Sequence, residues 1–81
     1  LINRAEALKM MLFAKALQDS SIADIVNPFS DVSVDQWFYN YVMVGYKLSI
    51  VQGYEDGTFG PGRNITRAEF TKIFIETLLN N

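Results

Sequence analysis

The sequence predicts an all-α fold of three main helices joined by a long, structured, turn-rich loop. The first observation is a repeated phrase: Ile-Asn-Arg-Ala-Glu at residues 2–6 returns as Ile-Thr-Arg-Ala-Glu at residues 65–69, an offset of 63 residues. The second is that apolar residues recur at helical spacing after each copy and once between them. The third is a cluster of glycine and proline at residues 53–62, which interrupts regular structure. Such an offset suits a small helical repeat with its own loop, and arrays of repeats bind through surfaces that the units build together.

The repeated phrase also predicts the domain organisation. We interpret residues 1–27 as the closing helix of one repeat and a linker, and residues 28–81 as a complete repeat. In each copy the first polar side chain, Asn3 or Thr66, can accept the backbone N–H of the glutamate three residues later, and that glutamate can reach back to the cap. Each copy therefore opens a helix.

The three helices are expected from Arg4 to about Leu17, from about Gln36 to Leu48, and from Arg67 to about Leu79. The inward residues of the first helix should be Ala5, Leu8, Met11, Leu12 and Ala16. Those of the last should be Phe70, Ile73, Phe74, Ile75 and Leu78, with an ion-paired solvent edge formed by Glu69, Lys72 and Glu76. Ser33 or Asp35 should cap the second helix, and two very short strands beside residues 56–57 are an alternative to an irregular loop.

Composition excludes several classes of function. The chain has no cysteine and no histidine, which removes thiolate metal ligands, the commonest general base and the commonest transition-metal ligand. With a net charge of -2, the chain lacks the excess of basic residues expected of a nucleic-acid binder. No apolar run is long enough to insert into a membrane, and no signal peptide is visible. No acid/base or nucleophile pair is evident, and residues 55–56 lack the ligand pattern of an EF-hand, so we predict neither an enzyme nor a cofactor or metal site.

The arginines of the two phrases are candidate ligand contacts. Arg4 and Arg67 lie in the first turn of their helices, where an exposed cation opposes the helix dipole at a cost of about 0.3–1 kcal/mol. A guanidinium beside free helix N–H groups suits a carboxylate or a phosphate. The alternative is that Arg67 pairs with Glu69 or with a loop carboxylate and only tethers the loop.

Several motifs, taken in order, carry a family resemblance. They are Phe-Ser-Asp-Val at residues 29–32, Trp37, Ile-Val-Gln-Gly-Tyr-Glu-Asp-Gly-Thr-Phe-Gly-Pro at residues 50–61, and Ile-Thr-Arg-Ala-Glu-Phe at residues 65–70. This series resembles the S-layer homology (SLH) repeat, and residues 2–17 resemble the closing helix of a preceding repeat. Only the linker at residues 18–28 lies outside the resemblance. It implies a non-enzymatic anchoring module whose repeats sit in threes around a pseudo-threefold helical core.

The resemblance also implies a ligand and a site. SLH domains bind cell-wall polysaccharide, often through pyruvate-ketal carboxylates, in grooves between neighbouring repeats, and the arginine of the Thr-Arg-Ala-Glu motif is the main ligand contact. The candidate glycan-binding residues here are Arg67, Arg4, Trp37, Asp31, Gly57, Thr58 and Glu69. The alternatives are a core position for Trp37, a local turn or helix cap for Asp31, and a turn that requires glycine at residues 57–58. The expected location is the bacterial cell surface, in contact with the cell wall.

Two departures from the family pattern favour a second function. Ser49 stands where relatives usually carry glycine, so a left-handed residue is expected there at some cost. Tyr39, Met43 and Tyr46 add a second apolar stripe to the second helix, which then needs two partners. The candidates for the second partner are a further repeat, a second copy of the chain, or the rest of a parent protein. The alternative function is therefore a structural or oligomerisation element that does not bind glycan.

Overall fold

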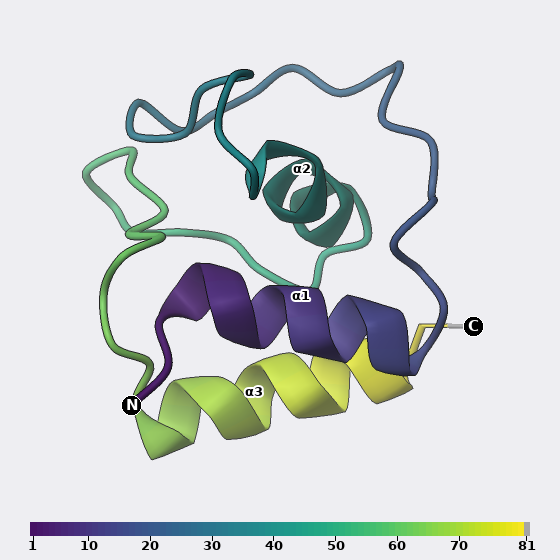
Figure 1. Ribbon diagram of the computed structural model, residues 1–81, viewed down its shortest axis with the longest axis vertical. Coiled ribbons are helices and arrows are strands. Elements are labelled where there is room, and N and C mark those ends of the chain that lie inside the picture. The colour runs from purple at the N-terminus through teal and green to yellow at the C-terminus, as the bar shows by residue number, and fades with distance from the viewer. Residues whose placement is uncertain (81) are drawn as a thin grey trace.

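A computed structural model of the chain describes residues 1–80, which form three helices connected by long loops (Figure 1). Helix α1 spans Arg4–Ala14, α2 spans Tyr39–Lys47 and α3 spans Arg67–Leu78. No strand occurs within residues 1–80, where the only β pairing is an isolated bridge between Asn3 and Asn64. The all-α prediction is confirmed, and the two short strands considered beside residues 56–57 do not form. The last position of the predicted repeat, residue 81, lies outside the described residues.

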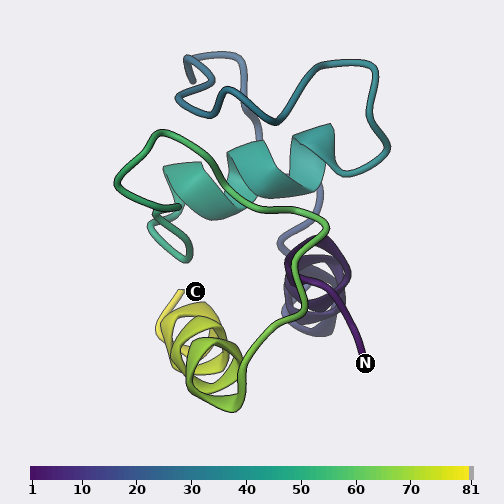
Figure 2. The ribbon, with the colours of Figure 1, turned by 90° about the vertical axis from the view of Figure 1, so that its left-hand side faces the viewer.

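Helix α1 lies at the centre of the arrangement and contacts both other helices. It runs beside α3, and α2 crosses over it (Figures 1 and 2). The core lies where α1 and α2 meet the turn-rich loop, and its fully buried side chains include Leu8, Leu12, Val42, Met43, Ile50 and Phe59. The second apolar stripe on α2 is thus explained in part, because Met43 belongs to this core.

The first helix begins as predicted but ends earlier. Asn3 and Glu6 form the expected capping box at its start. At its end Ala16 adopts a left-handed φ of 54°, and the Leu17 N–H donates to the Leu12 carbonyl at 2.8 Å. This Schellman geometry turns the chain away after Ala14, so the predicted end at Leu17 is wrong and Ala16 is exposed rather than inward.

The second helix begins later than predicted. The Ser33 backbone N–H donates to the Gln36 side chain at 2.7 Å, and the Ser33 hydroxyl donates to the Asp35 carboxylate at 2.7 Å. These polar groups satisfy one another in a local turn, so neither Ser33 nor Asp35 caps α2. The N-cap is instead Phe38, which makes no side-chain capping bond.

Ser49 terminates α2 in the left-handed conformation that its position suggested. Its φ is 61°, and the next N–H, that of Ile50, donates to the Gly45 carbonyl at 2.8 Å. We expect Ser49→Gly to raise the free energy of unfolding by about 1 kcal/mol, because glycine adopts this conformation without the Cβ penalty. Urea denaturation checks the change, with Ser21→Gly, at ordinary φ, as a destabilising control. A destabilisation by Ser49→Gly as large as that of the control would contradict this account.

The last helix is correctly located, but its inward face is narrower than predicted. It ends at Leu78, one residue before the expected Leu79. Of the predicted inward residues Ile73 is buried and Phe70 is half-buried, whereas Phe74, Ile75 and Leu78 are each close to half exposed. The reason is that α3 packs on α1 along one side only (Figure 2). The predicted ion-paired edge is also wrong, because the Glu69 carboxylate pairs with Arg4.

The structure also bears on membrane insertion. No helix in the described part of the chain combines the length and the apolarity needed to cross a bilayer.

Candidate functional site

A small pocket opens where the start of α1, the loop after α2 and the first half of α3 meet. Its volume is about 130 Å³, and its lining consists of Arg4, Ile50, Val51, Gln52, Gly53, Tyr54, Glu69, Lys72 and Ile73. The charged side chains of this lining are two cations and one carboxylate, which leaves an excess of positive charge. The pocket is built from segments far apart in the sequence, so only the tertiary fold assembles it.

Arg4 is a buried and firmly held side chain in this pocket. Only 6% of the residue is exposed. Its Nε donates to the Phe59 carbonyl at 2.9 Å, and a terminal nitrogen donates to a Glu69 carboxylate oxygen at 2.7 Å. The guanidinium carbon lies 4.8 Å from the ring centroid of Tyr54 and 4.7 Å from that of Phe59. Two of the five guanidinium N–H groups are used by these bonds, so the group is held rigidly while it keeps further donors.

Glu69 holds Arg4 in place and caps α3 at the same time. One carboxylate oxygen accepts the Thr66 backbone N–H at 3.0 Å, and the other accepts Arg4 and the Tyr54 hydroxyl, the latter at 3.1 Å. The Thr66 backbone N–H is the largest cause of the lowered pKa of the Glu69 carboxyl. The side chains of Thr66 and Tyr54 and the charge of Arg4 act in the same direction, and burial opposes them. The Glu69 carboxylate is therefore held in its charged form, and in that form it positions the Arg4 guanidinium.

The lowered pKa makes the stability of the fold depend on pH. A carboxyl whose pKa is lowered by folding stabilises the folded state above its ordinary value of 4.5, and this contribution is lost as the pH falls through the lowered value. We expect the wild type to lose stability more steeply below pH 4.5 than Glu69→Gln does. Urea unfolding between neutral and acidic pH measures both slopes. The pKa values of Asp24 and Asp56 are also lowered, and they contribute equally to both proteins, so parallel curves would contradict this role for Glu69.

Asp31 clamps the turn-rich loop rather than forming a local turn or capping a helix. Its two carboxylate oxygens accept the backbone N–H groups of Phe59 and Gly60, each at 2.8 Å. The interpretation as a local turn or helix cap is wrong, because these partners lie 28 and 29 residues away. Asp31 therefore fixes the segment whose Phe59 carbonyl binds Arg4.

Gly57 and Thr58 belong to the tip of the same loop and lie outside the pocket. Gly57 has a φ of 86°, which explains the need for glycine. The Thr58 hydroxyl and backbone N–H both donate to one carboxylate oxygen of Asp56, at 2.6 and 3.0 Å. These polar groups are thus engaged within the turn itself.

Trp37 lines a second, wider groove on the other side of α1. The groove has a volume of about 690 Å³ and is lined by Ile2, Glu6, Lys9, Met10, Phe13 and Trp37. The core interpretation of Trp37 is wrong, because 56% of the residue is exposed. The Lys9 ammonium lies 5.7 Å from its ring centroid, within the range of a cation–π contact.

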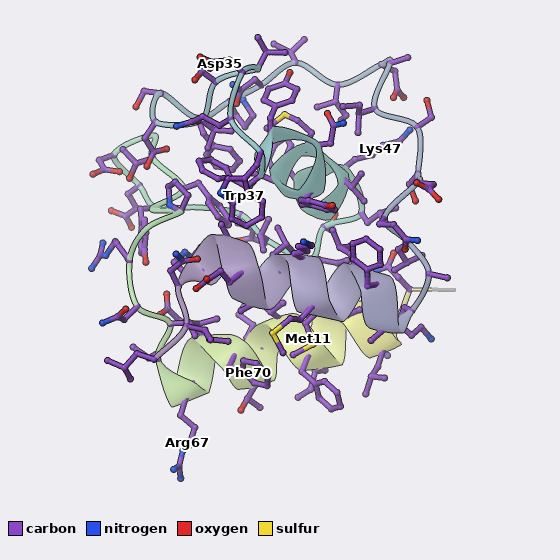
Figure 3. All side chains as sticks on the ribbon, in the orientation of Figure 1. Met11, Asp35, Trp37, Lys47, Arg67 and Phe70 are labelled. Atoms are coloured by element: carbon purple, nitrogen blue, oxygen red, sulfur yellow. The ribbon has the colours of Figure 1, made fainter. Side chains whose placement is uncertain are left out.

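Arg67 lines neither the pocket around Arg4 nor the groove around Trp37. It is exposed, and its side chain points away from the body of the molecule at the start of α3 (Figure 3). Within residues 1–80 its side chain makes no hydrogen bond or ion pair, so the alternative of a tether to Glu69 is wrong. Of the seven predicted site residues, the structure therefore brings together only Arg4 and Glu69.

Sequence reasoning named only Arg4 and Glu69 among the nine residues that line the first pocket, and it missed the other seven. They are Ile50, Val51, Gln52, Gly53, Tyr54, Lys72 and Ile73. One signal pointed to Lys72, because a lysine follows the glutamate by three residues in both copies of the phrase, as Lys9 and Lys72. The carboxylates are scattered, and no group of three acidic side chains within residues 1–80 converges on a metal position. The cationic side chains of the first pocket give it the chemistry to bind an anion.

Comparisons with known proteins point to the same family as the sequence motifs do. The sequence model of the S-layer homology domain matches residues 28–71. The chain is 38% identical over 79 residues to Cell surface glycoprotein 1 of Acetivibrio thermocellus, 32% over 78 residues to the Middle cell wall protein of Brevibacillus brevis, and 35% over 83 residues to the Cellulosome-anchoring protein of Acetivibrio thermocellus. Each alignment covers 95% of this chain but only 3%, 7% and 18% of the respective relative. No solved structure gives a significant match.

The extent of these matches decides the family. The domain model covers more than half of the chain, and the sequence relatives cover nearly all of it. The resemblance found in the motifs is thus confirmed, and the chain belongs to the S-layer homology domain family.

Proposed function

We propose that this chain is a non-enzymatic anchoring module that attaches a bacterial surface protein noncovalently to an acidic cell-wall polysaccharide or a peptidoglycan-linked polymer. The names of the relatives support this, since they include a cell surface glycoprotein, a cell wall protein and a cellulosome-anchoring protein. The observation that carries the proposal is the pocket that is lined by the immobilised Arg4 and by Lys72.

The pocket has the chemistry that a sugar-borne carboxylate requires. A pyruvate ketal or a uronic acid would pair with Lys72 and with the free N–H groups of Arg4. Gln52 and Gly53 line the same space, and their backbone N–H groups have no protein acceptor within residues 1–80. Charge-assisted hydrogen bonds from a preorganised guanidinium are about twice as strong as neutral ones. Because Arg4 is already fixed, little conformational entropy is lost when the anion binds.

The other predicted residues take supporting roles in this proposal. Glu69 positions Arg4, and Asp31 with Gly57 and Thr58 fixes the loop that bounds the pocket. Trp37 offers an exposed indole on which a neutral sugar of the same polymer would stack. Arg67 offers a second cation at the start of α3.

Binding to purified cell-wall sacculi tests the proposal. We expect Lys72→Ala to weaken co-sedimentation by about 10- to 100-fold, the range for loss of one hydrogen bond to a charged group. Lys15→Ala is the matched control, because it removes the same charge from the same protein outside the pocket. Equal binding by both variants, or a wild type that never pellets with sacculi, would rule out this site.

One observation favours the structural or oligomerisation alternative. Phe74, Ile75 and Leu78 on α3, and Leu79 directly after it, leave 45–71% of their surface exposed. Sedimentation velocity separates the two functions, because an oligomerisation element should associate as the concentration rises. A monomer that binds sacculi would favour the anchoring function, and an oligomer that does not bind them would favour the alternative.

A further inference from the structure

Three aromatic side chains lie around the ammonium group of Lys9. The Lys9 Nζ is 5.7 Å from the ring centroid of Trp37, 5.8 Å from that of Tyr41 and 5.9 Å from that of Phe13. The Tyr41 ring also contacts the other two, with centroid distances of 5.9 Å to Phe13 and 6.2 Å to Trp37. Each distance to the ammonium is within the range of a cation–π contact. The three rings, which we call the aromatic cage, are therefore arranged to hold a cation.

Lys9 occupies this cage without any stronger attachment. Within residues 1–80 its ammonium makes no ion pair and no hydrogen bond. Glu6 lies one turn earlier on α1, but one of its carboxylate oxygens accepts the Asn3 backbone N–H at 2.9 Å in the helix cap. Cation–π contacts at exposed sites change an equilibrium constant by only about two- to fivefold. The Lys9 side chain is exposed and can leave the cage at little cost.

A recess of about 350 Å³ shares all three rings of the cage. The rest of its lining is polar and consists of Gln18, Asp19 and Asn40. None of these three side chains makes a hydrogen bond to protein within residues 1–80, and the side-chain oxygen of Gln18 is buried without a donor. The lining contains one carboxylate and no lysine or arginine. Because unpaired acceptors near aromatic faces favour donors and positive charge, the recess suits a cationic ligand that carries hydrogen-bond donors.

We propose that this recess binds an amino sugar, whose ammonium group pairs with Asp19 and competes with Lys9 for the aromatic cage. The apolar face of the sugar ring packs on the cage, and its hydroxyls bond to Asn40 and Gln18. The volume of the recess accommodates a monosaccharide. The inference goes beyond the proposed function and does not rest on it, because the ligand is a cation and the recess shares no residue with the pocket around Arg4.

Lys9 is an internal competitor of the ligand in this arrangement. Lys9→Met keeps an unbranched side chain but removes the cation from the cage. We expect it to strengthen binding of the amino sugar by about two- to fivefold, the size of one exposed cation–π contact. A site for an anion would respond in the opposite direction, because it would lose an attractive charge. The sign of the change therefore reports the charge of the ligand.

Indole fluorescence tests the proposal, since Trp37 is the single tryptophan of the chain and lines the recess. Titrations with glucosamine and with N-acetylglucosamine, at neutral pH and constant ionic strength, compare two sugars that differ in the charge of the nitrogen. We expect glucosamine to bind about fivefold or more tightly in the wild type. Asp19→Asn should weaken glucosamine binding by about two- to fivefold, as for an exposed ion pair, and leave N-acetylglucosamine unaffected.

The controls separate the recess from general effects of charge. Lys15→Met removes the same charge outside the recess and should leave glucosamine binding unchanged. Tetramethylammonium chloride carries a cation without a sugar and should bind more weakly than glucosamine. Equal binding of glucosamine and N-acetylglucosamine, no response to glucosamine, or weaker binding by Lys9→Met than by the wild type would overturn the proposal. Tetramethylammonium binding as tight as that of glucosamine would overturn the sugar as the ligand.

Discussion

Replacing Arg4 by alanine is expected to lower the free energy of unfolding by about 3–5 kcal/mol, the range for removal of one partner from a buried ion pair. The change leaves the Phe59 carbonyl and the Glu69 carboxylate without their donor, in a place where Arg4 is only 6% exposed. A domain of this length has a total stability of about 4–12 kcal/mol. The variant should therefore be partly unfolded at neutral pH, which urea denaturation and circular dichroism detect.

Arg67→Ala is the matched control, because it makes the same change at the same position of the second phrase. Arg67 is exposed and has no protein partner within residues 1–80, so we expect a change of about 0.5 kcal/mol or less. Equal destabilisation by the two substitutions would contradict the distinction between the arginines. The large effect at Arg4 also means that loss of wall binding by Arg4→Ala would report unfolding, which is why Lys72 is the better probe of the pocket.

Phe59→Ala is expected to cost about 3–5 kcal/mol, as for other fully buried phenylalanines. The side chain is 0% exposed, and its ring centroid lies 5.6 Å from that of Phe29 and 4.7 Å from the Arg4 guanidinium carbon. Its removal opens a cavity and takes away one wall of the arginine enclosure. Thermal unfolding followed by circular dichroism measures the loss.

The control for Phe59 is a phenylalanine on an open face. Phe74 is 45% exposed on α3, so Phe74→Ala should cost about 1 kcal/mol or less in the 81-residue chain. Similar costs for Phe59→Ala and Phe74→Ala in the 81-residue chain would mean that the turn-rich loop does not contribute to the core as described.

The local features of the fold were predictable because their causes are local. Asn3 with Glu6 and Thr66 with Glu69 stand three residues apart, and both capping boxes form where the sequence indicated. The helix ends were less predictable. Nothing in the composition around Ala16 predicts a left-handed residue there. The first helix was therefore expected to continue past its actual end at Ala14.

The site was only half predictable because its contacts are long-range. Both arginines were identified from the repeated phrase, but Arg4 acquires its role from Phe59 and Glu69, which lie 55 and 65 residues away. Helical periodicity likewise showed that Phe74 and Ile75 share an apolar face of α3. It could not show which partner covers that face, so both residues were wrongly expected in the core of this chain.

We propose that the pocket containing Arg4 and Lys72 binds an acidic cell-wall polysaccharide. Its most direct test is an NMR titration of the ¹⁵N-labelled chain with polysaccharide released from purified sacculi. We expect the amide shifts to concentrate at Gly53, Tyr54 and Lys72, and we expect Lys72→Ala to raise the polysaccharide concentration at the titration midpoint by about 10- to 100-fold. Shifts confined to the groove around Trp37, or no shifts at saturating polysaccharide, would contradict it.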